Sequence, residues 1–381
     1  MDKILFFLLF LTASFLGYWF LPHKSRSPFL LIASLFFAFS FSAGYSCLFL
    51  FNIVIIHYIS NILKNKNDRG KVFYLRLSLL WLIGNLCFFK YNNLIFNFAN
   101  LLLPIGISYV TFRLIHYIVE VYRGNIVNTS FIELAVYVLF FPTFLAGPVD
   151  RFPRFNSQSR EIRKFEIAEF NYGLLRIIYG VIKKAVIADR LAGFIMPVLH
   201  APQGYPRGIV ILSVYGLAIQ LYMDFSGYTD MAIGIARLFG YKIMENFDKP
   251  YFKKNIALFW RSWHISVYSW IRDYFFFPVF GCRASKAMIY LGTVVTMVVF
   301  HLWHKATLGF LFLGIYHGIG LLVWQLFQVV KRKYSFFKNV HSYRWPGLIS
   351  WFITFSFVSF GCIFFNSNIT SAFNIIKRIF M

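Results

Sequence analysis

The chain has 381 residues, of which 59% are hydrophobic and only 14% are charged. Ordinary soluble domains carry about 25% charged residues, so this chain has too few polar side chains to cover one water-soluble domain. The composition excludes a disordered protein and a soluble enzyme with a normal surface. Because roughly 20 apolar residues span a bilayer, the chain is predicted to be an all-α, polytopic integral membrane protein.

Lys and Arg total 38 against 14 Asp and Glu, which gives a net charge of +24. In a soluble protein such an excess would indicate a nucleic-acid partner. Here the basic residues lie mainly in short connections between apolar runs, as the positive-inside rule and anionic lipid head groups require. We therefore expect the lipid bilayer as the partner and no nucleic acid, with a minor share of the charge available for an acidic substrate or an acidic cytosolic protein.

The cysteines are widely scattered, and no pair has the spacing of a metal site or a redox motif. We expect neither a disulfide framework, nor a metal site, nor a bound cofactor. The four positions are Cys47, Cys87, Cys282 and Cys362.

Apolar runs predict the helices in chain order. They lie at about 4–21, 29–63, 72–90, 101–122, 131–146, 174–199, 208–223, 231–240, 287–304, 306–330 and 346–366. The second run is too long for one span, so a turn near 42–44 is expected to divide it. With no internal repeat and no linker, the chain is predicted to form one domain over 1–381, with about 10–12 transmembrane or re-entrant helices.

Orientation is partly encoded in the basic loops. Residues 23–26 and 64–71 are basic and are predicted to face the cytosol, which places the N-terminus outside. Pro142, Gly147 and Pro148 interrupt the fifth run before a basic stretch. This predicts a broken or re-entrant element, which is tolerated at membrane depth only when it is buried in protein or faces water.

Two carboxylates, Asp224 and Asp230, lie between apolar runs. Carboxylates at membrane depth are costly unless paired or solvated, so they are candidates for a functional site. The alternative, which we favour at this point, is that they lie at the interface and cap a helix, as an Asp, Ser or Thr before an apolar run often does.

Residues 259–274 combine aromatic and polar side chains. On a continuous helix the polar ones would form one stripe, with His264 at its edge. Such a helix fits an interfacial or re-entrant position, and the stripe either lines a water-filled cavity or faces the lipid head groups. Its members are Arg261, Ser262, Ser266, Ser269, Arg272 and Asp273.

Three histidines follow within apolar runs. His301 and His304 are three residues apart and therefore share one helix face, and His317 lies on the next helix. An intramembrane histidine acts as a base, a proton relay or a hydrogen-bonding link between helices. The composition equally allows a transporter or flippase that uses such His and Asp residues for proton coupling.

Four stretches together resemble the membrane-bound O-acyltransferase family, specifically its bacterial branch, over roughly residues 100–365. They are 141–151 (FPTFLAGPVDR), 224–234 (DFSGYTDMAIG), 259–266 (FWRSWHIS) with 272–274 (RDY), and 302–304 (LWH) with 317–318 (HG). The resemblance implies a central funnel of tilted and broken helices. It also implies that His304 is the catalytic histidine and His264 a second catalytic histidine shared within the branch.

Other residues of these stretches are expected, through the same resemblance, to contact substrate or line the channel: Asp224, Arg261, Trp263, Ser266, Asp273, His301, Trp303 and His317. The chain departs from the family pattern at Lys305, where the family has glycine, and at His301, where it usually has a small residue.

The resemblance implies a cell-membrane enzyme that moves a small acyl group, with acetyl expected, to hydroxyls of an exported polysaccharide or another envelope polymer. D-alanyl transfer to teichoic-acid-type polymers is the alternative. The donor is expected to be acetyl-CoA or an acyl-carrier-protein thioester presented at the cytosolic side. A separate exported or periplasmic acyltransferase is expected as a partner.

Overall fold

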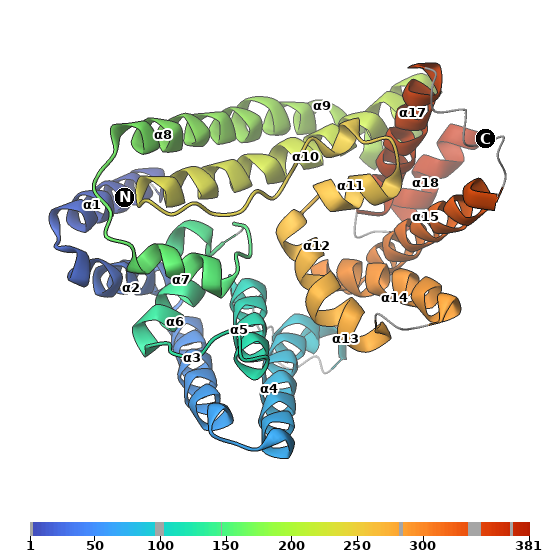
Figure 1. The fold of residues 1–381 in the computed structure, drawn as a ribbon. Helices are drawn as coiled ribbons and strands as arrows, with labels where there is room; N and C mark the ends of the chain where they lie inside the picture. The colour runs from blue at the N-terminus through green and yellow to red at the C-terminus, as the bar shows by residue number, and fades with distance from the viewer. Residues whose placement is uncertain (1–2, 96–102, 146, 282–284, 334–343, 366–368) are drawn as a thin grey trace. The chain divides into compact units, whose positions relative to one another are not determined.

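The computed structural model describes residues 3–95, 103–145, 147–281, 285–333, 344–365 and 369–381 (Figure 1). Within these ranges the chain is helical, and the extended pairing consists of one isolated bridge between Phe247 and Trp263. The all-α prediction is confirmed. The described residues group into two compact units, one of residues 1–179 and 228–244 and the other of residues 180–227 and 245–381. The prediction of one domain over 1–381 stays a prediction.

Unit 1 contains the N-terminal helices and the end of α10. They are α1 (Lys3–Phe20), α2 (His23–Phe39), α3 (Ala43–Lys64), α4 (Asp68–Ile95), α5 (Ile107–Tyr122), α6 (Phe131–Leu139), η1 (Phe141–Thr143), α7 (Phe152–Arg160) and most of α8 (Ile167–Val181). The expected turn in the 29–63 run is present, because α2 ends at Phe39 and Ser42 caps α3 through a hydrogen bond from the Tyr45 amide.

Unit 2 contains the first two thirds of α10 and the C-terminal helices. They are η2 (Ile182–Ala188), α9 (Asp189–His200), η3 (Pro202–Gly204), α10 (Arg207–Leu238), η4 (Pro250–Phe252), α11 (Ile256–Ser262), α12 (Ile265–Ile271), η5 (Arg272–Phe276), α13 (Phe277–Phe280), α14 (Lys286–His304), α15 (Leu308–Lys333), α17 (Arg344–Gly361), η7 (Cys362–Phe365) and α18 (Ile369–Phe380). Of these, η2 and η5 are π-helical.

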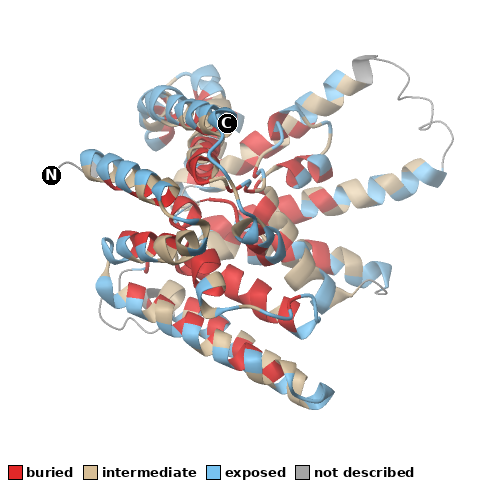
Figure 2. Cartoon of the chain, turned by 60° about the vertical axis from the view of Figure 1, so that its left-hand side comes forward, coloured by how far each residue is buried: buried red, intermediate tan, exposed pale blue. Residues whose placement is uncertain are grey.

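Large apolar side chains cover much of the exposed surface. Leu80 is 72% exposed and Phe194 is 77% exposed, and exposed pale blue faces run along many helices in Figure 2. Six described helices are long and apolar enough to cross a bilayer: Ala43–Lys64, Asp68–Asn92, Arg207–Leu238, Lys286–His304, Leu308–Lys333 and Gly347–Phe365. The protein is therefore a multi-pass membrane protein whose exposed apolar faces meet lipid.

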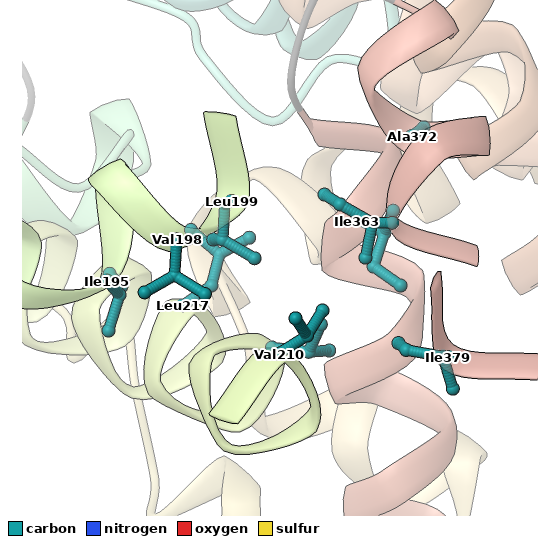
Figure 3. Close-up of a cluster of buried hydrophobic side chains, with 10 residues drawn as sticks. Ile195, Val198, Leu199, Val210, Leu217, Ile363, Ala372 and Ile379 are labelled. Carbon is teal, nitrogen blue, oxygen red and sulfur yellow. The ribbon is translucent and has the colours of Figure 1, made fainter. Parts of the chain in front are cut away.

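The interior of unit 2 includes an apolar cluster in which α9 and α10 meet the C-terminal segment (Figure 3). Val210 and Val214 of α10 are fully buried there, and Ile375 and Ile379 of α18 pack into the same cluster. α18 is amphipathic, with its apolar residues at helical spacing. Arg378 on its last turn donates two hydrogen bonds to the Tyr205 carbonyl, which fixes the end of the helix.

The carboxylates of the 224–230 motif are in the middle of a helix. α10 runs without interruption from Arg207 to Leu238, so the expectation that they cap a helix at the interface was wrong. In unit 1, Asp230 pairs with Arg176 of α8 at 2.7 Å. In unit 2, Asp224 pairs with Lys184 of η2 at 2.6 Å. Each acid is thus neutralised by a cation on the antiparallel neighbour, which removes most of the cost of placing it between apolar residues.

Glycines let these helices approach closely beside the ion pairs. A Cβ on Gly234 would lie 2.6 Å from the Gly173 carbonyl in unit 1, and one on Gly227 would lie 2.8 Å from the Gly180 carbonyl in unit 2. Small residues at helix contacts are how membrane helices bring their backbones together. Asp224 and Gly227 are three residues apart and Asp230 and Gly234 are four apart, so each acid shares a helix face with its glycine. This pattern explains the polar motif as a helix-pairing device.

The predicted break before residue 148 is confirmed. Arg113, which was not predicted as a site residue, stabilises it. α6 ends at Leu139, and the backbone continues through η1 while remaining buried. The guanidinium of Arg113, which is 2% exposed, donates to the Tyr137 and Val138 carbonyls at 3.1 and 2.8 Å and to Thr143 Oγ1 at 2.6 Å. It satisfies carbonyls that the interrupted helix leaves without partners.

Arg113→Lys is predicted to destabilise the folded protein by about 2–5 kcal/mol, because an ammonium cannot reach acceptors on both sides of the break and leaves buried carbonyls unsatisfied. The measurement is thermal unfolding in detergent. Arg123→Lys, at the C-terminal cap of the same helix and 40% exposed in its side chain, is the matched control and should cost less than about 1 kcal/mol. Equal melting temperatures for the two variants would contradict this role.

Candidate functional site

The segment expected to form one polar-striped helix is broken at His264. α11 ends at Ser262, α12 begins at Ile265, and His264 adopts the left-handed conformation with φ 47° and ψ 48°. The single continuous stripe was therefore wrong, because a left-handed residue ends one helix and redirects the chain into the next. A left-handed histidine is uncommon, and such backbone strain is retained where the surrounding structure enforces it, often at functional sites.

Asn246 enforces this geometry. Its backbone carbonyl accepts from the Ile265 amide at 2.9 Å. Its side-chain Oδ1 lies 3.1 Å from His264 Nδ1 and accepts from the Ser266 amide at 3.2 Å and the Ser266 hydroxyl at 2.9 Å. Asn246 and Ser266 are fully buried. One amide side chain therefore fixes both the turn at the helix break and the imidazole ring.

These contacts determine which nitrogen of His264 carries the proton. The Ser266 backbone N–H can only donate, so the Asn246 atom that faces it is the oxygen. That oxygen accepts from His264 Nδ1, which consequently bears the hydrogen and leaves the lone pair on Nε2. His264 Nε2 is buried and makes no hydrogen bond within the described part of the chain. Because buried polar atoms are normally paired, this lone pair makes His264 a candidate for the functional site.

His264 is 1% exposed, and aromatic rings surround it. The ring of Phe225 lies edge-on at 4.7 Å between centroids, and that of Phe300 lies at 6.3 Å. His264 is outside the six helices that are long enough to cross a membrane. Burial lowers the pKa of His264 to about 3, because the apolar surroundings disfavour the imidazolium. The ring is therefore neutral at physiological pH.

His304 lies beside this ring. It is the last residue of α14, and its ring centroid is 6.3 Å from that of His264. Phe300 and Trp303 pack against His304 at 5.3 and 4.5 Å. The fold thus brings together two histidines that are 40 positions apart, at a separation where one small reacting group can contact both rings.

His301 and His317 form a second pair nearby. Their rings are parallel, with an interplanar angle of 2° and centroids 5.5 Å apart. Trp260 stands perpendicular to both, at 5.6 and 5.0 Å, and Phe300 contacts His301 at 5.1 Å. His301 Nδ1 lies 2.8 Å from the Met297 carbonyl and donates to it. Phe300 therefore packs against both pairs, through His301 here and through His264 and His304 in the first pair.

Phe300 also lines a cavity of about 210 Å³. Arg261 and Arg272 line it, together with Thr296 and Gln325. Arg272 pairs with Asp273 at 2.8 Å, whereas Arg261 forms no ion pair with a described residue. Thr296 Oγ1 and Gln325 Oε1 are buried without hydrogen-bond partners among the residues that the structure describes.

The remaining predicted residues support the site rather than point at the histidine pair. Trp263 stacks on Phe259 at 5.6 Å and pairs with Phe247 through the isolated bridge. Asp224 is held by Lys184, and it is the neighbouring Phe225, not the carboxylate, that packs on His264. Asp273 binds its neighbour Arg272 and is not part of the histidine cluster.

Four residues that surround the histidines were not predicted as site residues: Phe225, Asn246, Trp260 and Phe300. Phe225 lies inside the 224–234 stretch. Trp260 lies inside the 259–266 stretch, and Asn246 lies in a short polar segment, 245–249. The sequence pattern therefore distinguishes both positions from their surroundings. Phe300 is one of 50 phenylalanines, and nothing in the sequence distinguishes it. Across the described ranges, no group of three or more His, Cys, Asp or Glu side chains is placed to hold a metal ion.

The comparisons with known proteins identify the family of the chain. The chain belongs to the membrane-bound O-acyltransferase family, whose model matches residues 3–367. It is thus a membrane acyltransferase. A transporter without acyl chemistry, the rival considered from composition, is not supported.

Relatives fall into three named activities. The chain is 34% identical to the probable alginate O-acetylase of Pseudomonas syringae over 95% of this chain and 71% of that protein. It is 30% identical to the peptidoglycan O-acetyltransferase of Helicobacter pylori over 98% of this chain and 78% of that protein. It is 32% identical to the teichoic acid D-alanyltransferase of Bacillus subtilis over 70% of this chain and 69% of that protein.

Asn246→Ala is predicted to lower the rate of acyl transfer about 10- to 100-fold, since partners that orient functional histidines have effects of this size when removed. The substitution frees His264 Nδ1 and leaves the Ser266 amide unsatisfied. Transfer is measured as thiol release from an acyl thioester by the protein in nanodiscs.

Asn255→Ala is the matched control. Asn255 caps α11 by accepting from the Leu258 amide at 2.9 Å, so its loss should cost about 1 kcal/mol of stability and leave transfer unchanged. An Asn246→Ala protein with the wild-type rate would show that Asn246 does not orient the site.

Proposed function

We propose that the protein transfers an acetyl group from an intracellular thioester to a hydroxyl of an exported polysaccharide or related envelope polymer. The observation that carries the proposal is the pairing of His264 and His304 in an aromatic, buried site, with the His264 Nε2 lone pair unoccupied. Acyl transfer is the activity of the family to which the chain belongs. The alginate and peptidoglycan O-acetylating relatives, which match 95–98% of this chain, support a polysaccharide acceptor.

His304 serves as the general base. A base works best when its pKa is near the operating pH, and burial makes His264 too weak a base for this task. His304 takes the proton from the acceptor hydroxyl as its oxygen attacks the thioester carbonyl. The carbon–sulfur bond then breaks, and the departing thiolate receives the proton from His304. Acetyl ester and free thiol are the products, and no other reactant is needed.

His264 orients the reactants. Its Nδ1–H is committed to Asn246, so neutral His264 has no proton to give to an oxyanion and offers only the lone pair on Nε2. It therefore accepts a hydrogen bond from the acceptor hydroxyl or from an N–H of the donor. General-base catalysis raises the rate about 10²–10⁴-fold. Holding the two substrates between the rings accounts for the larger part of the rate enhancement, because it removes their translational and rotational freedom before the reaction.

The charges near the site favour acetyl over D-alanyl. Arg261 and Arg272 line the same cavity as Phe300, and Lys305 follows His304 directly. Asp273 is already paired with Arg272. A D-alanyl group carries an ammonium, which these cations repel, whereas acetyl is neutral. Acetyl-CoA and an acetylated carrier protein both present the thioester that the proposal requires.

His304→Ala and His264→Ala are each predicted to lower acetyl-dependent thiol release at least 100-fold, because one removes the base and the other the orienting lone pair. The assay uses the protein in nanodiscs with acetyl-CoA or acetyl-carrier protein and an oligosaccharide acceptor.

His200→Ala is the control, since His200 lies at the end of α9 and is exposed. It should keep the wild-type rate. Retained transfer in a folded His304→Ala protein would refute the assignment of the base.

Replacing Arg261 and Arg272 together by Gln is predicted to reduce the preference for acetyl over D-alanyl thioesters about tenfold, because the repulsion of the ammonium falls when the cations are removed. The readout is the ratio of kcat/KM for the two donors. A wild-type preference for D-alanyl thioester would overturn the choice of acetyl.

A further inference from the structure

Unit 1 contains a second cavity, of about 740 Å³, that the proposed acyl transfer does not use. We propose that this cavity binds the phosphate-bearing head group of an anionic phospholipid. It lies where α1 and α10 end and α8 begins, and it is lined in part by Trp19, Arg154, Lys164, Glu169, Arg237 and Lys242.

The lining has a surplus of positive charge. Five Lys or Arg residues line the cavity against three carboxylates, which leaves an excess of two cations in the lining. One of the five, Arg154, lies 3.9 Å from Asp150 outside the lining. Glu169 bridges two of the cations, at 2.9 Å from Arg237 and 3.0 Å from Lys242. Lys164 forms no ion pair with a described residue, and Arg237 Nε is buried without a hydrogen-bond partner in the described part of the chain. A bound phosphate would supply the hydrogen-bond acceptor that Lys164 and Arg237 Nε lack.

The wall beside these charges is aromatic. Trp19 donates from Nε1 to the Leu238 carbonyl at 2.9 Å, and Phe165 stacks edge-on against Trp19 at 5.5 Å. The guanidinium of Arg26 lies 4.7 Å above the Trp19 ring. Tryptophan beside Lys and Arg at the end of an apolar helix is the arrangement found at the boundary between lipid chains and water.

The cavity faces the side that basic loops assign to the cytosol. Arg26, in the loop predicted to be cytosolic, donates to the Arg163 carbonyl at 2.7 Å, and His23 contacts the Glu161 carbonyl at 2.7 Å. Both carbonyls belong to residues that line the cavity. Anionic lipids populate the cytosolic leaflet, and basic pockets between membrane helices on that side bind their head groups.

A lipid suits the site better than an acidic protein does. The site is a concave pocket with an aromatic wall at helix ends, and a head group with its phosphate and glycerol fits such a pocket. A docking protein would instead need a broad surface of roughly 800 Å² on each partner.

The test titrates the full chain in detergent with short-chain phosphatidylglycerol and, separately, with phosphatidylcholine of the same chain length, and follows bound lipid by native mass spectrometry. Phosphatidylglycerol should bind more tightly. Lys164→Gln should weaken it about fivefold, and Lys164→Gln with Arg154→Gln about 25-fold, since each basic residue near a membrane surface contributes about a fivefold gain.

Lys331→Gln with Arg332→Gln removes two charges from the end of another apolar helix, α15, and should leave binding unchanged. Because Lys164 is exposed and unpaired, the single variant keeps the test valid if the double variant unfolds. Equal affinity for the two lipids, or equal losses in the test and control variants, would overturn the proposal. So would cavity-dependent binding of an acidic carrier protein without any preference for phosphatidylglycerol.

Discussion

The candidate site depends on one side chain, Asn246. Its oxygen accepts from an imidazole nitrogen, a backbone amide and a hydroxyl, and its own backbone carbonyl secures the next turn of chain. Through these contacts the chain adopts a left-handed conformation at His264, and α11 and α12 form as two helices rather than one. The same contacts fix the tautomer of His264, which leaves the Nε2 lone pair directed into an aromatic enclosure with His304 beside it.

The rest of the fold shows how a chain with few charges places them at membrane depth. Asp224 and Asp230 are each paired with a cation on a neighbouring helix, at positions where glycines bring the backbones together. Arg113 is used differently: it binds carbonyls at the break after α6 and so lets irregular backbone remain buried. Each of these polar groups has a charged or hydrogen-bonding partner within its own unit. Such a partner is needed because an unpaired polar group is costly in a low-dielectric environment.

Much of this architecture could be predicted from the sequence, and the failures have identifiable physical causes. Long apolar runs and the turn near Ser42 follow from hydropathy and capping, so the division of the 29–63 run into α2 and α3 was predicted correctly. The runs 208–223 and 231–240 instead form one helix, α10, and α18 lies beyond the last predicted run. Asp224 looked like a helix cap because sequence alone does not show Lys184 on the neighbouring helix. The continuous helix expected over 259–274 fails at His264, because local periodicity does not report a left-handed residue enforced from Asn246, 18 positions away.

For the site itself, the resemblance to the acyltransferase family selected His264 and His304, and the fold places their rings together. Phe300 could not be predicted, because a phenylalanine in an apolar helix has no distinguishing signal until its neighbours in space are known. Its contacts with both histidine pairs, and its place in the lining of the cavity that Arg261 also lines, become apparent only in three dimensions.

The central claim is that the thioester and the acceptor hydroxyl react between the rings of His264 and His304. The most direct measurement is an experimental structure of the protein in nanodiscs with a thioether analogue of acetyl-CoA, in which the thioester carbonyl is replaced by a methylene. The prediction is that this methylene lies between the two rings, within about 4 Å of a nitrogen of each. An analogue bound elsewhere, with Phe225, Phe300 and Trp303 still closed around an unoccupied His264 Nε2, would contradict the claim.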